Sequence, residues 1–205
     1  VYDLGLNVFR DTVTRNPKIK PRILKLSLEL IDRERHGEVV DRSVLHSLTQ
    51  MLIDVGVTER NVYEEDFEKP FLEATTNFYR AESQEFITSN SCSDYMKKAE
   101  VRIREELDRV AQYLDVSTEC KLKEVVEGEL IAAHMKALLE MESRGLVSMV
   151  KEGRVNDLQR MYSLFGRVKD GHQMMREMLA NHIKGEGLFI VNDEEKNKNP
   201  IDFVQ

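Results

Sequence analysis

Histidines are the side chains most able to bind a metal in a helical protein, and this sequence does not group them. The five histidines form no HExxH pair and no short ligand spacing; they are His36, His46, His134, His172 and His182. Glu129 and His134 have four residues between them, whereas the di-iron helical bundles use a Glu-x-x-His spacing. The sequence therefore predicts no metal site.

The two cysteines and the closest glycine pair do not predict a reactive site either. Cys92 and Cys120 lack a CxxC partner and cannot make a disulfide framework, which favours a reducing intracellular setting. A catalytic thiol needs a positioned base, which a sequence alone does not show, and we do not expect either cysteine to be one. Gly185-Glu186-Gly187 is too short to hold a phosphate and is predicted to end a helix. We expect no catalytic residue, no cofactor and no enzyme activity.

The composition is typical of a helical protein with a well-solvated surface. Of 205 residues, 41% are apolar and 33% charged, and four prolines are few for this length. The net charge of −7 is spread along the chain without a long basic stripe, so nucleic acid is not expected as a partner. No apolar run approaches the ~20 residues of a membrane span. The chain begins at Val1 rather than Met, so we expect a piece of a longer protein.

Apolar residues recur at helical spacing along nearly the whole chain, which predicts an all-α fold. Pro21 is expected in the first turn of a helix, and Asp41 is expected to cap the next one. Ser93 or Asp94 is expected to cap the helix that follows residue 90. The predicted helices cover residues 4–16, 19–36, 41–56, 70–86, 94–114 and 117–139, with shorter segments at 145–150, 158–165 and 174–183, a polar loop at 192–200, and an N-cap at Asn199-Pro200.

The stretch DFEKPFLEATTNFYRAESQEF (66–86) is rich in phenylalanine, and it has two interpretations. It is either an exposed aromatic binding surface or a helix face that packs against neighbouring helices. Leu72, Tyr79 and Phe86 are seven residues apart, and so are Phe71 and Phe78, which favours a buried face. Pro70 either begins this helix or kinks one that starts near Tyr63.

Two further helices carry side chains that could form binding surfaces. In the helix of residues 95–114 a narrow apolar stripe is predicted to be buried and the opposite charged face to be solvated. That face comprises Lys97, Lys98, Glu100, Arg102, Arg104, Glu105, Glu106 and Arg109. Met174, Met175 and Met178 could make an adaptable binding face, but their spacing favours core packing.

Five segments, in order, resemble one family. They are IDRERHGEVVDR (31–42), VYEEDFEKPFLEATTNFYRAES (62–83), YMKKAEVRIREELDRVAQYLD (95–115), MESRGLVSMV (141–150) and DLQRMYSLFGRVKDG (157–171). They are similar to the cullins, the scaffold subunits of RING ubiquitin ligases. The segments at 62–83 and 141–150 look like the cullin-3 type, which uses BTB-domain substrate adaptors. The resemblance extends over essentially the whole chain.

The resemblance implies a rigid rod of stacked cullin repeats, each a bundle of about five helices. Residues 1–116 would be the second repeat, and residues 117–205 the third repeat without its last helix. It also implies a non-catalytic scaffold that holds substrate and ubiquitin-charged enzyme at a fixed separation in ubiquitin-dependent protein degradation. A cytoplasmic and nuclear location is expected. The alternative is a free-standing cullin-like module that competes for ligase partners.

The family's binding sites are expected outside this chain. Adaptor binding belongs chiefly to the first repeat, whereas the RING subunit and the ubiquitin-like modifier belong to the C-terminal domain. No partner-binding residue is therefore assigned, and no nucleic acid or membrane is expected as a partner. Two residues depart from the family pattern: Gly128 replaces a charged helix-former, and Gln159 replaces a glycine.

Overall fold

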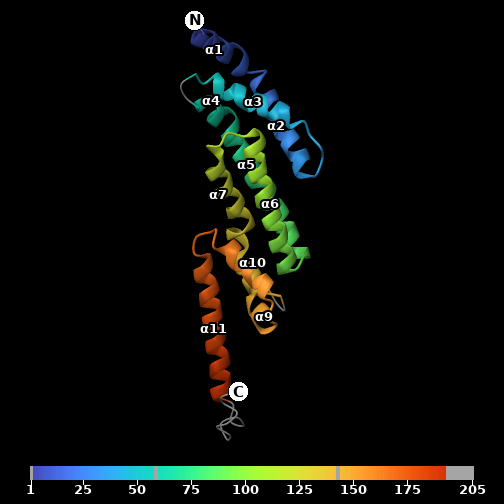
Figure 1. The fold of residues 1–205 in the computed structure, drawn as a ribbon, viewed down its shortest axis with the longest axis vertical. Coiled ribbons are helices and arrows are strands. Elements are labelled where there is room, and N and C mark those ends of the chain that lie inside the picture. Colours follow the sequence, from blue (N-terminus) through green and yellow to red (C-terminus); the bar gives the residue numbers. More distant parts are fainter. Residues whose placement is uncertain (1, 58–59, 142–143, 193–205) are drawn as a thin grey trace. The chain divides into compact units, whose positions relative to one another are not determined.

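The computed structural model describes residues 2–57, 60–141 and 144–192, and these residues form helices joined by short turns (Figure 1). No strand occurs among them, so the predicted all-α fold is confirmed. The α-helices are α1 (Tyr2–Phe9), α2 (Lys20–Arg35), α3 (Arg42–Asp54), α4 (Asn61–Tyr63), α5 (Lys69–Ser89), α6 (Cys92–Tyr113), α7 (Thr118–Leu130), α8 (Met135–Glu140), α9 (Leu146–Lys151), α10 (Val155–Phe165) and α11 (Gly171–Asn192).

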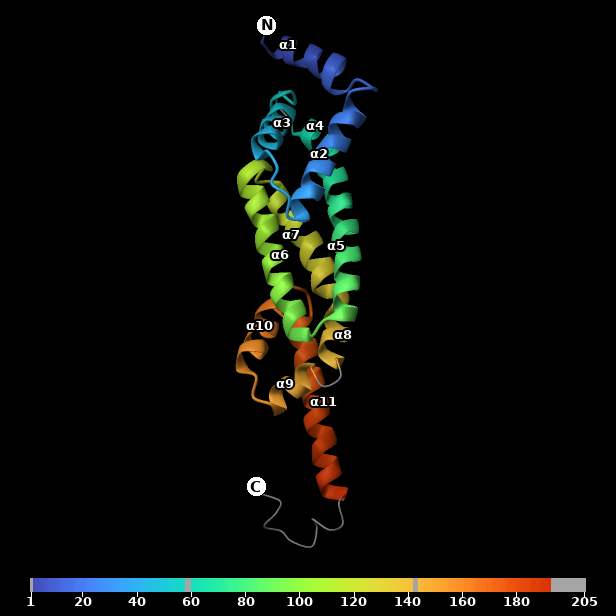
Figure 2. The same cartoon turned by 90° about the vertical axis from the view of Figure 1, so that its right-hand side faces the viewer.

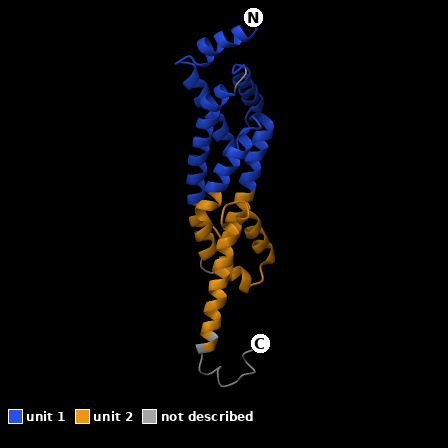
Figure 3. Ribbon diagram, turned by 90° about the vertical axis from the view of Figure 1, so that its left-hand side faces the viewer, with its two compact units in different colours: residues 1–84, 101–129 blue, residues 85–100, 130–205 orange. Residues whose placement is uncertain are grey.

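The chain divides into two compact units (Figure 3). Unit 1 contains residues 1–84 and 101–129, and unit 2 contains residues 85–100 and 130–205. Helices α5 and α6 contribute to both units. The units are discontinuous in sequence, whereas the expected repeats divide between residues 116 and 117. The repeat boundaries therefore stay a prediction.

Unit 1 is built around α2, α5, α6 and α7, which lie side by side (Figure 2). Polar contacts join α2 to α6, α5 to α6 and α5 to α7. The apolar core of the unit comprises Ile31, Leu45, Leu52, Val55, Val62, Tyr63, Phe67, Phe71, Tyr79, Ile103, Val110, Tyr113, Leu114, Leu122 and Val126. The stripe predicted for the helix of residues 95–114 is Met96, Ala99, Ile103, Leu107, Val110 and Leu114. Ile103, Val110 and Leu114 are buried in this core and Met96 and Ala99 in unit 2, so the predicted buried face of that helix is confirmed.

Several helix ends follow the local sequence. Pro21 lies in the first turn of α2, where its missing N–H costs little. The helix ends at Arg35, and Gly37 takes φ +89°, a left-handed conformation that glycine adopts without strain. The Asp41 side chain accepts a hydrogen bond from the Ser43 backbone N–H at 3.0 Å, which confirms the predicted cap of α3.

Proline 70 belongs to a continuous helical path rather than to a helix start. The path begins with α4 at Asn61 and passes through the π-helical segment η2 (Glu64–Glu68) before α5. A second π-helical segment, η1 (Arg10–Thr14), follows α1. A π-helical turn is wider than an α-helical one, and such turns are rare. Sequence spacing did not predict either of them.

Three predicted helix boundaries are wrong. Ser91, not Ser93 or Asp94, caps α6, because its hydroxyl accepts from the Asp94 N–H at 3.1 Å and donates to the Asp94 carboxylate at 2.7 Å. Helix α7 ends at Leu130, and a short 3₁₀ turn precedes α8. Helix α11 runs on to residue 192, so Gly185 and Gly187 lie inside it. The predicted N-cap at Asn199-Pro200 lies outside the described residues.

Unit 2 is a smaller helical cluster in which α11 contacts α8, α9 and α10. Its core comprises Cys92, Tyr95, Met96, Ala99, Leu130, Ile131, Met135, Leu138, Leu139, Leu146, Met149, Met161, Leu164, Phe165 and Met175. In the part of the chain that the structure describes, no helix is long and apolar enough to cross a membrane.

Candidate functional site

The phenylalanine-rich helix is a packing element. Phe67, Phe71 and Tyr79 are at most 2% exposed, while Phe78 and Phe86 are half-buried. The aromatic rings stack on one another: those of Phe67 and Phe71 lie 5.8 Å apart with an interplanar angle of 5°. The predicted buried face is confirmed, and the exposed aromatic surface is not what this stretch forms.

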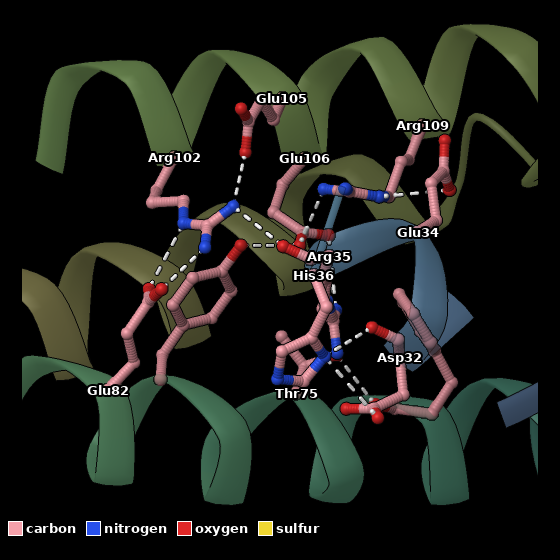
Figure 4. Close-up of polar contacts among 12 residues, drawn as sticks. Asp32, Glu34, Arg35, His36, Thr75, Glu82, Arg102, Glu105, Glu106 and Arg109 are labelled. Atoms are coloured by element: carbon pink, nitrogen blue, oxygen red, sulfur yellow. Dashed lines mark hydrogen bonds and ion pairs between the residues drawn. The ribbon is translucent and has the colours of Figure 1, made fainter. Parts of the chain in front are cut away.

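The same helix face leads into a buried polar network centred on Arg35 of α2 (Figure 4). Arg35 donates from Nε to Glu106 Oε1 at 2.8 Å and from Nη2 to Glu106 Oε2 at 3.2 Å. Its Nη2 also donates to the Thr75 hydroxyl at 2.8 Å. The guanidinium lies 5.1–5.6 Å from the ring centroids of Phe78, Tyr79 and Phe71, within cation–π range. A charged group is thus held among aromatic rings by a two-pronged ion pair.

Glu106 joins a second arginine to this network. It accepts hydrogen bonds from Tyr79 at 2.5 Å and from Arg109 at 3.0 Å. Arg109 also donates to Glu34 at 3.2 Å, and Tyr113 donates to Glu34 at 2.7 Å. The side chains of Arg35, Glu106, Glu34 and Arg109 are each at most 6% exposed. Two buried cations therefore face two buried anions, which leaves the cluster electrically neutral.

The pKa shifts of Tyr79, Tyr113 and Glu34 keep each of these three groups in one protonation state at neutral pH. Burial, together with the charge of Glu106, raises the pKa of Tyr79 well above its usual value. Burial and the Glu34 carboxylate likewise raise the pKa of Tyr113. Burial opposes ionisation of Glu34, but hydrogen bonds from Tyr113 and Arg42 outweigh it and lower the pKa of Glu34. None of these groups is tuned to transfer protons near pH 7.

The predicted solvated face of α6 is wrong for its middle part. Glu106 and Arg109 are 1% and 5% exposed, and the Arg102 side chain is 17% exposed. Arg102 donates to Glu82 at 2.5 and 3.1 Å, to Glu105 at 2.8 Å and to the Arg35 carbonyl at 3.1 Å. Arg102, Glu106 and Arg109 therefore join α6 to α2 and α5.

A second buried polar cluster joins α7 to the π-helical segment η2. The Tyr63 hydroxyl and the Thr118 hydroxyl are 2.7 Å apart, and Thr118 donates to Glu68 at 2.7 Å. Lys121 donates to the other oxygen of Glu68 at 2.6 Å. Burial raises the pKa of Tyr63 to about 12. Like the first cluster, it satisfies its polar groups internally and offers no nucleophile.

The histidines are not brought together. His134 is buried and stacks edge-on against Tyr95 at 5.7 Å. Glu129 instead pairs with Arg80 at 2.7 Å. His172 lies against Tyr162, with ring centroids 3.9 Å apart. Among the described residues no group of three potential ligands from histidine, cysteine, aspartate and glutamate could hold a metal ion.

The cysteines and methionines are mostly packing residues. Cys92 is fully buried, and its thiol donates to the Leu138 carbonyl at 3.6 Å. Burial raises the pKa of Cys92 to about 12, the opposite of what a nucleophilic thiolate needs. Met175 is buried, whereas Met174 and Met178 are partly exposed. Core packing is confirmed for Met175 alone.

Comparisons with known proteins give one consistent result. The family model of the cullin alpha solenoid domain matches residues 1–205. Over the whole chain, the sequence is 50% identical to cullin-3 of Dictyostelium discoideum and 47% identical to cullin-3A of Arabidopsis thaliana. It is 38% identical to human cullin-4A over 98% of the chain. These alignments cover 25–28% of the relatives, so the chain spans about a quarter of their length.

Proposed function

Because the chain belongs to the cullin family, we propose that it is a rigid segment of the scaffold subunit of a cullin-RING ubiquitin ligase. The predicted resemblance is confirmed, and the identities of 45–50% to cullin-3 relatives agree with the predicted cullin-3 type. The segment separates the substrate-adaptor end of the ligase from the RING end. It has no catalytic role of its own, because proximity of the bound components drives the reaction.

The observation that carries this proposal is the buried network that joins α2, α5 and α6. When two helices pack through apolar side chains alone, one helix can shift along or tilt against the other, because many alternative apolar contacts have similar energies. Arg35 and Glu106 do not allow this, because separating them would leave two charges unpaired inside the protein. The network therefore favours a bundle of fixed register, which a spacer between two ends of a complex requires.

The proposed partners bind outside this segment. BTB-domain adaptors and the RING-box subunit would contact other parts of the parent cullin, and the ubiquitin-like modifier would be attached there too. A cytoplasmic and nuclear location is part of the same proposal. Substrates are not specified by any residue of this segment, because a spacer contacts neither substrate nor ubiquitin-charged enzyme.

Calorimetry with BTB-domain adaptors tests whether the segment is a passive spacer. We expect no binding to the 205-residue chain and clear binding to a chain extended upstream by one repeat. Binding to the 205-residue chain itself would contradict the spacer proposal. It would favour the alternative, a module that competes for ligase partners.

Stiffness is tested in the parent cullin with the substitution Glu106→Gln. We expect slower substrate ubiquitination with unchanged adaptor affinity, because the ends are held less firmly. Glu38→Gln is the matched control, since Glu38 pairs with Arg33 at 2.7 Å on the surface of the same unit. Equal ubiquitination rates for both variants would contradict a role for the buried network in scaffold function.

A further inference from the structure

The hydroxyl group of Thr14 differs from the other helical threonine hydroxyls of unit 1. Thr12, Thr49, Thr75 and Thr76 each donate to the backbone carbonyl four residues earlier, at 2.6–2.9 Å, and Thr118 donates to the Glu68 carboxylate at 2.7 Å. Thr14 is 3% exposed, and its Oγ1 has no hydrogen-bond partner among the described residues. A buried hydroxyl without a partner is costly, so this one requires an explanation.

The backbone around Thr14 is π-helical. Thr14 is the last residue of the π-helical segment η1, where the Arg15 N–H donates to the Arg10 carbonyl five residues back at 2.8 Å. Thr12 lies in the same segment and still donates to the Val8 carbonyl at 2.6 Å, whereas the Thr14 hydroxyl makes no such contact. The hydroxyl is thus left for a partner outside its own helix.

Thr14 lines a small cavity of about 10 Å³, which corresponds to the space needed by the centre of one water molecule. Three polar side chains line it: Thr14, Lys20 and Asp66. Its remaining wall is apolar and consists of Ile23, Leu24, Leu52 and Phe67. A water molecule needs two to four polar partners, and this wall offers three.

Asp66 has capacity for one more hydrogen bond. Its carboxylate is 6% exposed and accepts from Lys20 at 2.6 Å and from Arg15 at 3.3 Å. An ionised carboxylate has about four lone-pair sites, so two contacts leave room for a further donor. Asp66 belongs to the π-helical segment η2, so the two rare turns contribute residues to one cavity.

We propose that a single structural water molecule binds in this cavity and joins the Thr14 hydroxyl to the Asp66 carboxylate. The charged side chains around the cavity favour a neutral ligand over an ion. A cation would face Lys20 and Arg15, whereas an anion would face Asp66. The space of about 10 Å³ fits one water molecule. The water connects η1 to η2 and so fixes the first helix of unit 1 against the start of α5.

The substitution Thr14→Val tests the proposal, because a bound water molecule and a hydroxyl without a partner predict changes of opposite sign in the folding equilibrium constant. Valine keeps the shape and removes the hydroxyl. If water is bound, we expect the folding equilibrium constant to fall roughly two- to ten-fold, the usual effect of losing one hydrogen bond. If the hydroxyl has no partner, its removal should instead raise that constant. Thr49→Val is the control, because Thr49 is equally buried and already bonds its own helix.

A crystal structure of the unsubstituted chain gives an independent answer, even if Thr14→Val does not fold. We expect a water molecule within about 3.2 Å of both Thr14 Oγ1 and an Asp66 oxygen. Thr14→Ser should retain it, because serine keeps the hydroxyl. A direct bond from Thr14 to protein, or a Thr14→Val variant more stable than the unsubstituted chain, would overturn the proposal.

Discussion

Replacing Glu106 with glutamine tests how much the buried network stabilises unit 1. The Glu106 side chain is 2% exposed and accepts from Arg35, Arg109 and Tyr79. Glutamine keeps the size but removes the negative charge and turns an amide N–H₂ toward these donors. The two arginines would then face Glu34 as the one remaining anion of the neutral group.

The expected loss in the free energy of unfolding is about 3–5 kcal/mol, the usual cost of leaving a buried charge unpaired. That is a large part of the roughly 5–15 kcal/mol that stabilises a typical domain. The matched control is Glu38→Gln. Glu38 pairs with Arg33 at 2.7 Å, as close as Arg35 is to Glu106, but both side chains are more than half exposed. An exposed pair contributes less than about 1 kcal/mol.

Urea unfolding followed by circular dichroism is the suitable assay, because the chain is helical and has no tryptophan. A second variant separates charge from packing: Arg35→Met combined with Glu106→Leu. We expect it to recover part of the stability lost in Glu106→Gln, since it removes a cation together with an anion and fills the space. If Glu106→Gln and Glu38→Gln lose equal stability, burial does not decide the strength of these pairs and the reasoning fails.

Three further predictions concern pH, helix propensity and thiol reactivity. The pKa of Tyr79 is raised in the folded state, so its contribution to stability is complete below about pH 10 and is lost as pH rises further, by up to about 1.4 kcal/mol per pH unit. Urea unfolding should therefore show a shallower alkaline loss for Tyr79→Phe, and equal slopes would contradict this. Gly128→Ala should raise the free energy of unfolding by about 1 kcal/mol, because a Cβ there meets nothing within 4 Å, whereas Gly171→Ala should lower it, because its Cβ would lie 2.1 Å from a backbone oxygen. Thermal unfolding checks both signs. Iodoacetamide should alkylate exposed Cys120 well before buried Cys92, as peptide mass spectrometry would show, and equal rates would disprove the burial of Cys92.

The sequence predicted the helix ends that depend on residues close to one another in the chain. Asp41 caps α3 through a side-chain contact two residues away, and Pro21 fits the first turn of α2 for steric reasons. The π-helical segments were not predictable in this way. Their wide turns depend on what packs against them, as the contacts of Arg15 and Lys20 with Asp66 across about fifty residues of chain illustrate. The break after Leu130 likewise has no proline to announce it, and the apolar spacing continues past Gly128, which lies two residues before it.

The buried network was missed because its signal is divided between distant segments. Helical spacing assigns Glu106 and Arg109 to a charged face, which is usually solvated. Their partners Arg35 and Glu34 lie 71 and 75 residues earlier, also in a charged segment. A single sequence shows two polar faces but not that they meet. Opposite charges on two helices of one bundle are the signal that could have suggested the network. That signal was not sufficient, because many other pairings of charged residues fit the sequence equally well.

Register is where the network matters most for a spacer. The stripe of α6 repeats every three or four residues, so a slip of one turn, about 5.4 Å, would bring apolar side chains against apolar side chains again. The same slip would separate Arg35 from Glu106, now 2.8 Å apart, and leave both charged inside unit 1. Apolar burial therefore supplies much of the stability but would permit the slip. The buried ion pair of Arg35 and Glu106 would not permit it. The proposed role as a spacer requires that second property, and we infer that this is why the charges lie inside.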